Sequence, residues 1–151
     1  YVDCVLTFEE LQAMFDSRKL DVAGMEETLL NNASGYGRIF AHCGGLAEAA
    51  AVALKEQGID FDLKPLSCNG IEECKHALLK AARGKLDANF IEGMACVGGC
   101  VNGAGCMTHH ERNRVKVDAH SQQAQLKSIA DSLSSAVEID KGLAEKAGGK
   151  I

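Results

Sequence analysis

The chain has 151 residues, 46% of them hydrophobic, so it can bury one sizeable core and we expect a single globular unit. Its 16 basic and 21 acidic residues give a net charge of -5, which argues against a nucleic-acid partner, because such proteins usually present excess positive charge. No apolar run approaches the ~20 residues of a membrane span, and no secretory leader opens the chain. We therefore expect a cytoplasmic protein without a membrane partner.

The N-terminal region predicts one clear helix. Thr7 and Glu10 form a capping box ahead of an apolar stripe, which predicts a helix over residues 8–18. Residues 19–37 show no clean period and should be irregular or form short helical turns. The chain opens at Tyr1, inside patterned sequence, and this indicates a fragment of a longer protein.

The middle of the chain predicts strands that alternate with helices. Three short apolar segments favour strands, over residues 38–41, 59–63 and 89–92. The turn Cys43-Gly44-Gly45 leads into a buried helix that ends at Gly58, and Asn69 with Glu72 caps another helix that ends at Gly84. This order predicts an α/β fold, a parallel sheet flanked by helices.

The C-terminal region predicts one more helix and a tail. Residues 109–117 are polar and basic, and a final amphipathic helix should begin near Ser121 and continue to Val137. Its apolar stripe consists of Leu126, Ile129, Ala130, Leu133 and Val137. We expect one folded lobe over residues 1–137 and a flexible tail over 138–151.

Three of the seven cysteines and five glycines fall in one stretch, IEGMACVGGCVNGAGC, at residues 91–106. The stretch follows a predicted strand, where open α/β sheets bind ligands. Cys96 and Cys100 are separated by three residues, and Gly98 and Gly99 allow the backbone to approach a bulky inorganic group. An odd number of cysteines argues against a disulfide framework, so this pattern favours an iron-sulfur cluster.

Two alternatives remain open from the residues alone. One is a zinc site made from Cys96, Cys100, Cys106 and His109 or His110, although zinc ligands usually come in closer pairs. The other is a pair of structural cysteines in a glycine-rich turn. The remaining cysteines favour simpler roles: Cys74 and Cys43 as buried small residues, with Cys4 and Cys68 unassigned.

The string MACVGGCVNG at residues 94–103 resembles the last cysteine motif of the iron-only (di-iron) hydrogenases, whose common form is M-A-C-P-G-G-C-x-N/G-G. Three other segments resemble the same family in the same order: VDCVLTFEEL at 2–11, IFAHCGGLAEAA at 39–50 and FIEGM at 90–94. The resemblance runs from the first residues to about residue 106.

The resemblance implies one lobe of the iron-only hydrogenase fold, the C-terminal lobe of the catalytic domain. In such enzymes four cysteines hold a 4Fe-4S cluster, one of them bridging to a di-iron unit, and protons are reversibly reduced to dihydrogen. Cys96 matches the ligand of the 4Fe-4S cluster alone, Cys100 the bridging ligand, and Met94 the methionine beside the di-iron unit. Gly98 and Gly99 match the glycines that line the cofactor.

The departures from the family pattern set further expectations. The other cysteine motifs and the proton-transferring cysteine lie upstream in the family, so this chain alone should be inactive. Its partners should be the missing N-terminal lobe of the same parent chain, docked on an exposed apolar face, and a ferredoxin-like electron carrier in an anaerobic bacterium. Val97 replaces the common proline and Cys106 a common glutamine. The alternative is therefore a non-catalytic iron-sulfur carrier or hydrogen-sensor domain.

Overall fold

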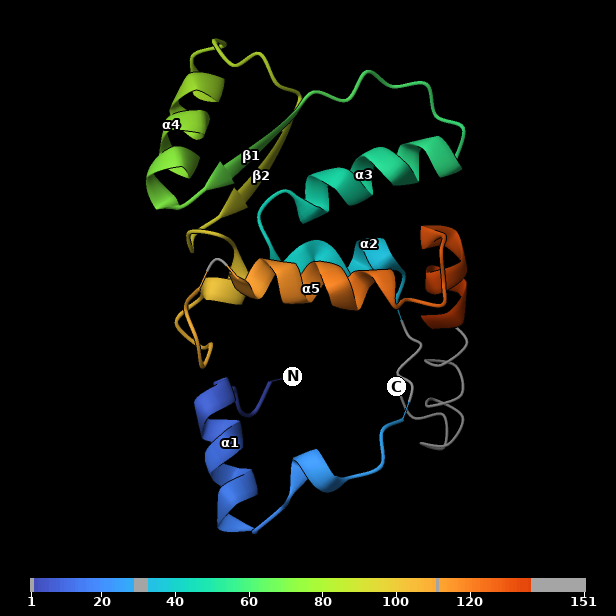
Figure 1. Cartoon of the computed structure of the whole chain (residues 1–151). Coiled ribbons are helices and arrows are strands. Elements are labelled where there is room, and N and C mark those ends of the chain that lie inside the picture. The colour runs from blue at the N-terminus through green and yellow to red at the C-terminus, as the bar shows by residue number, and fades with distance from the viewer. Residues whose placement is uncertain (1, 29–32, 111, 137–151) are drawn as a thin grey trace.

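The computed structural model describes residues 2–28, 33–110 and 112–136, and at its centre is a β-α-β unit (Figure 1). Strand β1 (Pro65–Asn69) pairs in parallel with β2 (Phe90–Met94), and helix α4 (Ile71–Ala82) connects them. Since parallel strands need a crossover, the helix between them accounts for the topology. The predicted α/β class with a parallel sheet is confirmed.

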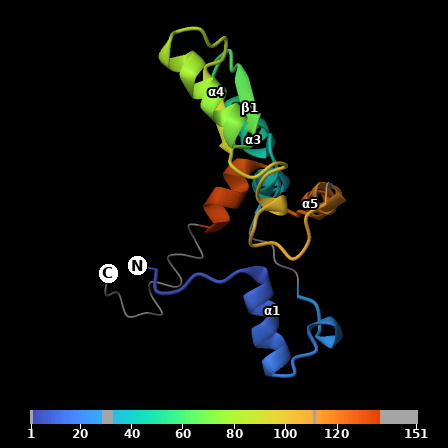
Figure 2. The ribbon, with the colours of Figure 1, turned by 90° about the vertical axis from the view of Figure 1, so that its left-hand side faces the viewer.

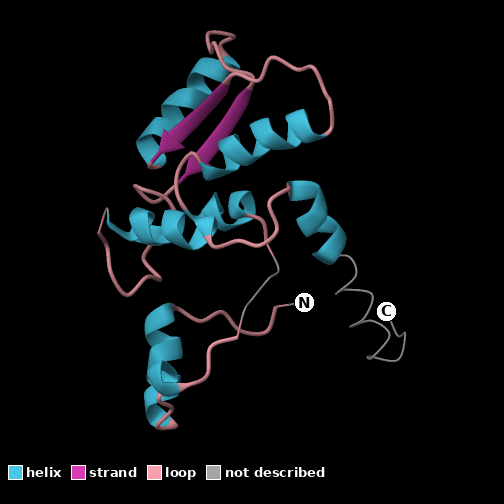
Figure 3. Cartoon of the chain, turned by 45° about the vertical axis from the view of Figure 1, so that its right-hand side comes forward, coloured by secondary structure: helices cyan, strands magenta, loops and turns pink. Residues whose placement is uncertain are grey.

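Side-chain alternation gives the two faces of the sheet different partners. On one face Gly93 leaves room for Cys74 of α4, whose Sγ would lie 3.3 Å from a Cβ at position 93. On the other face Ser67 and Glu92 point toward helix α3 (Gly45–Glu56). A second layer below α3 holds α2 (Gly35–Arg38), the short helix η2 (Ile39–Ala41) and α5 (Arg112–Gln122) (Figures 1 and 3).

The largest fully buried side chains include a carboxylate, that of Glu92. Its oxygens accept hydrogen bonds from the backbone N–H groups of Gly44 (3.1 Å), Leu46 (3.4 Å) and Ala47 (3.2 Å), and from the Ser67 hydroxyl (3.0 Å). The first N–H groups of a helix lack intrahelical partners and carry a partial positive charge. Glu92 therefore fastens β2 to the start of α3.

The N-terminal segment lies apart from this body. Helix α1 (Phe8–Ser17) has the predicted capping box, with the Thr7 hydroxyl accepting from the N–H of Glu10 and the Glu10 carboxylate accepting from that of Thr7. It contributes no buried residue, and both views show it separated from the other helices (Figures 1 and 2). A backbone hydrogen bond of 3.0 Å from Phe8 N–H to the Gly105 carbonyl ties it to the cysteine loop. A short helix η1 (Val22–Gly24) follows α1.

Two predicted strands are wrong. Residues 38–41 form the end of α2 and the short helix η2, because Ser34 caps a helical turn by accepting from Gly37 N–H at 3.2 Å. Residues 59–63 form two successive three-residue turns, in which the Phe61 N–H donates to the Ile59 carbonyl and the Leu63 N–H donates to the Phe61 carbonyl. These turns alternate side chains as a strand does, and Phe61 and Leu63 line an open pocket together with Phe90 and residues of α3.

Two predicted helix boundaries are also wrong. Gly70, not Asn69, precedes the first residue of α4, and Glu73 instead accepts from the N–H of Asn69 at 2.8 Å. The polar segment after residue 109 contains α5, while residues 129–136 form a separate helical segment. Glu56 caps that segment by accepting from the N–H groups of Ile129 and Ala130. Val137 and the predicted tail, 138–151, lie outside the described residues. Within the described ranges, no helix combines the length and apolar character needed to cross a membrane.

Candidate functional site: the cysteine loop

The loop after β2 takes its course from two glycines with positive φ. Gly98 has φ of 87° and Gly99 of 96°, a region that other residues rarely adopt. A Cβ at Gly99 would lie 2.7 Å from the Ala41 carbonyl oxygen and from the Cys43 nitrogen. The backbone of this chain at 41–43 thus already occupies the space beside Gly99. At Gly99 the missing side chain therefore lets the cysteine loop pack against residues 41–43 of the same chain.

Further hydrogen bonds hold the loop at the carboxyl end of the sheet. The N–H of Gly98 donates to Asn69 Oδ1 at 2.6 Å, and its carbonyl accepts from Cys43 N–H at 3.2 Å. The Met94 carbonyl accepts from Gly70 N–H at 2.8 Å. The prediction that Asn69 caps α4 is wrong, because its side chain accepts a hydrogen bond from the cysteine loop instead. Asn69 is the last residue of β1, a strand that the sequence analysis did not predict, so no pattern marked it as a site residue.

The loop presents two thiols with different exposure. Cys96 is half-buried, and a Cβ at Gly103 would lie 3.4 Å from its Sγ. Cys100 is exposed at the start of η3 (Cys100–Asn102). Met94, at the end of β2, is half-buried. The structure therefore places Met94, Cys96, Gly98, Gly99 and Cys100 in one loop at the strand's carboxyl end.

The donor set fits part of an iron-sulfur site. Thiolates are the usual ligands of such clusters, and both Cys96 and Cys100 are free. Among the described residues, no three His, Cys, Asp or Glu side chains are arranged to hold a metal ion. Cys106 Sγ donates to the Cys100 carbonyl at 3.1 Å, and His109 Nδ1 lies 3.2 Å from the Asn102 carbonyl. The zinc alternative thus finds no assembled ligand set in this part of the chain.

The cysteines outside the loop lie in less reactive surroundings. Cys68 is buried, and burial raises the pKa of its thiol, with the nearby Cys74 adding to the effect. Burial also raises the pKa of Cys43, and the negative charge of Glu92 raises it further. Although Cys43 lies beside the N-terminus of α3, Glu92 already occupies that positive end. This favours a structural role for Cys43. Cys4 is exposed.

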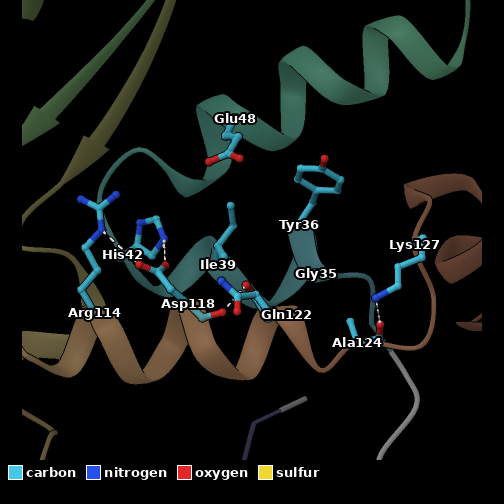
Figure 4. A pocket seen from close by; sticks show the side chains of 11 residues that line it. Gly35, Tyr36, Ile39, His42, Glu48, Arg114, Asp118, Gln122, Ala124 and Lys127 are labelled. Carbon is cyan, nitrogen blue, oxygen red and sulfur yellow. Dashed lines mark hydrogen bonds and ion pairs between the residues drawn. The ribbon is translucent and has the colours of Figure 1, made fainter.

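A second polar cluster lies behind the loop, between α2, α3 and α5 (Figure 4). His42 is 2% exposed, and its Nε2 lies 3.1 Å from Oδ1 of Asp118. Asp118 also pairs with Arg114, whose Nε is 3.7 Å from Oδ2. These side chains, with Glu48 and Tyr36, line a cavity of about 550 Å³. The sequence analysis gave no role to His42 or Asp118, which are 76 positions apart and show no shared pattern.

Comparisons with known proteins show what this chain is similar to. Residues 1–104 match the family described as "Iron only hydrogenase large subunit, C-terminal domain". Iron hydrogenase 1 of Clostridium pasteurianum is 29% identical over 155 residues, covering 83% of this chain and 27% of that protein. The periplasmic [Fe] hydrogenase large subunit of Nitratidesulfovibrio vulgaris is 31% identical over 134 residues, covering 69% and 32%.

A relative with a different name shows similar identity. The nuclear prelamin A recognition factor of Xenopus laevis is 27% identical over 136 residues, covering 69% of this chain and 30% of that protein. The chain thus spans about a third of the length of the curated relatives it matches. The matched family segment, residues 1–104, contains Met94, Cys96, Gly98, Gly99 and Cys100.

Proposed function

The chain belongs to the iron-only hydrogenase large-subunit family, in its C-terminal domain, and from that premise we propose that it is one lobe of a hydrogenase active-site domain. In this proposal Cys96 and Cys100 supply two of the four thiolates of a 4Fe-4S cluster, and Cys100 bridges to a di-iron unit. When bound, that cofactor supplies the electron and proton chemistry that interconverts protons and dihydrogen. By itself, the chain is expected to be inactive.

The observation that carries the proposal is the placement of the two thiols. Cys100 is exposed and Cys96 half-buried in a loop tied to Asn69 and Cys43, at the edge of the sheet where α/β folds bind ligands. A loop with fixed backbone holds thiolates in place, and exposure at Cys100 leaves room for ligands from another segment. Because two thiolates are half of a four-cysteine site, we propose that the other two come from the N-terminal lobe of the parent chain.

The remaining residues of the loop would shape the cofactor's surroundings. Gly98 and Gly99 fix the course of the loop through their positive φ, and Gly103 leaves room beside the Cys96 thiol, where a Cβ would lie 3.4 Å from Sγ. Met94 would pack beside the di-iron unit as an apolar, polarisable side chain. The N-terminal lobe would be supplied by the rest of the parent chain, and electrons by a ferredoxin-like carrier. We propose the cytoplasm of an anaerobic bacterium as the location.

A second candidate function is a non-catalytic iron-sulfur carrier or hydrogen sensor on the same fold. One observation favours it: a relative whose name does not include hydrogenase matches at an identity similar to that of the hydrogenases. Val97 and Cys106, which replace residues common in the family, change the immediate surroundings of the thiols. The two functions differ in whether a di-iron unit is present in the mature protein.

Infrared spectroscopy tests this difference. The full parent protein would be produced without oxygen, together with hydrogenase maturation proteins, and examined where metal-bound carbon monoxide and cyanide absorb. We expect bands in the wild type and in Cys4→Ser, and loss of the bands in Cys100→Ser. Cys4 is a suitable control because it is another exposed cysteine, on the N-terminal segment. Iron without these bands in the wild type would favour the carrier or sensor.

A further inference from the structure

Helix α5 begins at Arg112, beyond the residues 1–104 that match the family model. It contacts η3, which is part of the cysteine loop, and η2, which directly precedes His42 and Cys43. The first contact is the ion pair of Asp118 with the buried His42, at 3.1 Å. Figure 4 shows the imidazole between Arg114 and Asp118, with the α5 ribbon directly below. A helix that follows the family-model match thus makes a specific contact next to the proposed cofactor loop.

The hydrogen bonds of His42 explain why this contact orders the backbone. Its Nε2 faces a carboxylate oxygen of Asp118, and its Nδ1 lies 3.1 Å from the Cys43 carbonyl oxygen. Both partners are hydrogen-bond acceptors, so the two ring nitrogens connect Asp118 of α5 to the backbone at Cys43. Asp118 also pairs with Arg114, so the carboxylate that faces the ring is itself held on α5. With both nitrogens bound, the ring holds residues 42 and 43 to α5.

Residues 42 and 43 in turn hold the loop. The N–H of Cys43 donates to the Gly98 carbonyl, and a Cβ at Gly99 would lie 2.7 Å from the His42 Cα. Gly99 is buried against this turn and is the neighbour of Cys100. A displacement of the turn would therefore be transmitted through backbone contact to the position of the Cys100 thiol.

A second contact of α5 reaches the other side of the same cysteine. The side-chain amide nitrogen of Asn113 donates to the Val101 carbonyl at 3.0 Å and to the Thr108 carbonyl at 2.9 Å. Val101 directly follows Cys100 in η3. The backbone on both sides of Cys100 is thus bound, through His42 or directly, to polar side chains of one helix.

We propose that α5 is a brace for the cysteine loop, with His42, Asp118 and Asn113 as positioning residues that preorganise Cys100. The proposal deepens the proposed function and rests on it only for the identity of what the loop binds. The brace itself is a property of the protein without a cofactor. It can therefore be tested on the 151-residue chain, independently of the infrared experiment.

Hydrogen exchange of individual amides is the primary test, on Asp118→Ala, Asp118→Asn and the control Lys116→Gln, an exposed position of α5. In Asp118→Ala we expect the Cys43 amide to exchange about tenfold faster, the size of effect for a lost hydrogen bond to a charged group. The Asn102 and Gly103 amides, bonded within the loop, should also accelerate, while β1 and β2 amides keep their rates. Lys116→Gln should match the wild type.

The Asn variant separates a hydrogen-bonding brace from a purely structural role. An amide nitrogen at position 118 can donate to Nε2 of a neutral imidazole, so Asp118→Asn should restore protection at Cys43. Asn113→Ala should likewise accelerate the Asn102 and Gly103 amides and raise the alkylation rate of Cys100 relative to Cys4. Unchanged exchange at Cys43 in Asp118→Ala, equal acceleration across the sheet, or failure of Asn to rescue would each overturn the proposal.

Discussion

The buried carboxylate of Glu92 offers a quantitative test of how the fold is held together. We predict that Glu92→Gln lowers the free energy of unfolding by about 3 kcal/mol. The glutamine amide nitrogen is a donor, so in either orientation it faces at least one backbone N–H of α3 that the carboxylate now satisfies. A buried unsatisfied N–H costs about 1–3 kcal/mol, and loss of the charge at a helix N-terminus adds up to about 2 kcal/mol.

Urea unfolding followed by circular dichroism measures this effect. With a denaturant slope of about 2 kcal/mol/M, the midpoint should fall by about 1.5 M. Glu48→Gln is the matched control, because Glu48 lies in the first turn of the same helix but is exposed; it should cost less than about 1 kcal/mol. If Glu92→Gln shifted the midpoint no more than Glu48→Gln, the hydrogen bonds would not be carrying the stability assigned to them.

Three other predictions follow from the same structure. Gly99→Ala should destabilise the chain by about 2 kcal/mol more than Gly84→Ala in urea unfolding, because both have positive φ but only Gly99 would clash with neighbouring backbone; equal losses would contradict this. Because burial raises the pKa values of Cys43 and Cys68, the folded state binds more protons than the unfolded state above the ordinary thiol pKa of about 8.5, so stability should fall as the pH rises through that value. Unfolding titrations should show a shallower fall in Cys68→Ala, and an identical slope would argue against the shift. The chain should self-associate in sedimentation velocity as concentration rises, and a monomer throughout would count against an exposed docking face. The most exposed large apolar side chains are those of Val5, Val2, Val97, Val115, Ile71, Phe8 and Leu78.

Local chemistry predicted several elements well. The Thr7 and Glu10 capping box is a short-range signal that needs no tertiary partner, and α1 begins where it predicts. Gly58 and Gly84 both have positive φ directly after helices, as their predicted roles as helix ends require. The family resemblance identified the loop that contains Cys96 and Cys100, because its motif is contiguous in sequence.

Elements that depend on distant partners were missed. Residues 59–63 have the alternation of a strand, but pairing decides whether alternation becomes a sheet, and β1 forms later in the chain. Helix α5 has no apolar stripe, so periodicity gave no signal. It is held instead by contacts with α2, η2 and η3 and by polar side chains such as Asp118 and Asn113. The partnership of His42 with Asp118 exists only once the chain has folded.

Gly93 of β2 and Cys74 of α4 share one small space, so substitutions at the two positions are coupled. Gly93 has no side chain, and a Cβ there would lie 3.3 Å from the Sγ of Cys74 in α4. A valine at 93 would overfill the contact, whereas alanine at 74 would leave a void. A side chain at 93 therefore requires Cys74 to shift or to be replaced by a smaller residue. The residue tolerated at 93, in the strand that precedes the cysteine loop, thus depends on the residue at 74 in the helix behind the sheet.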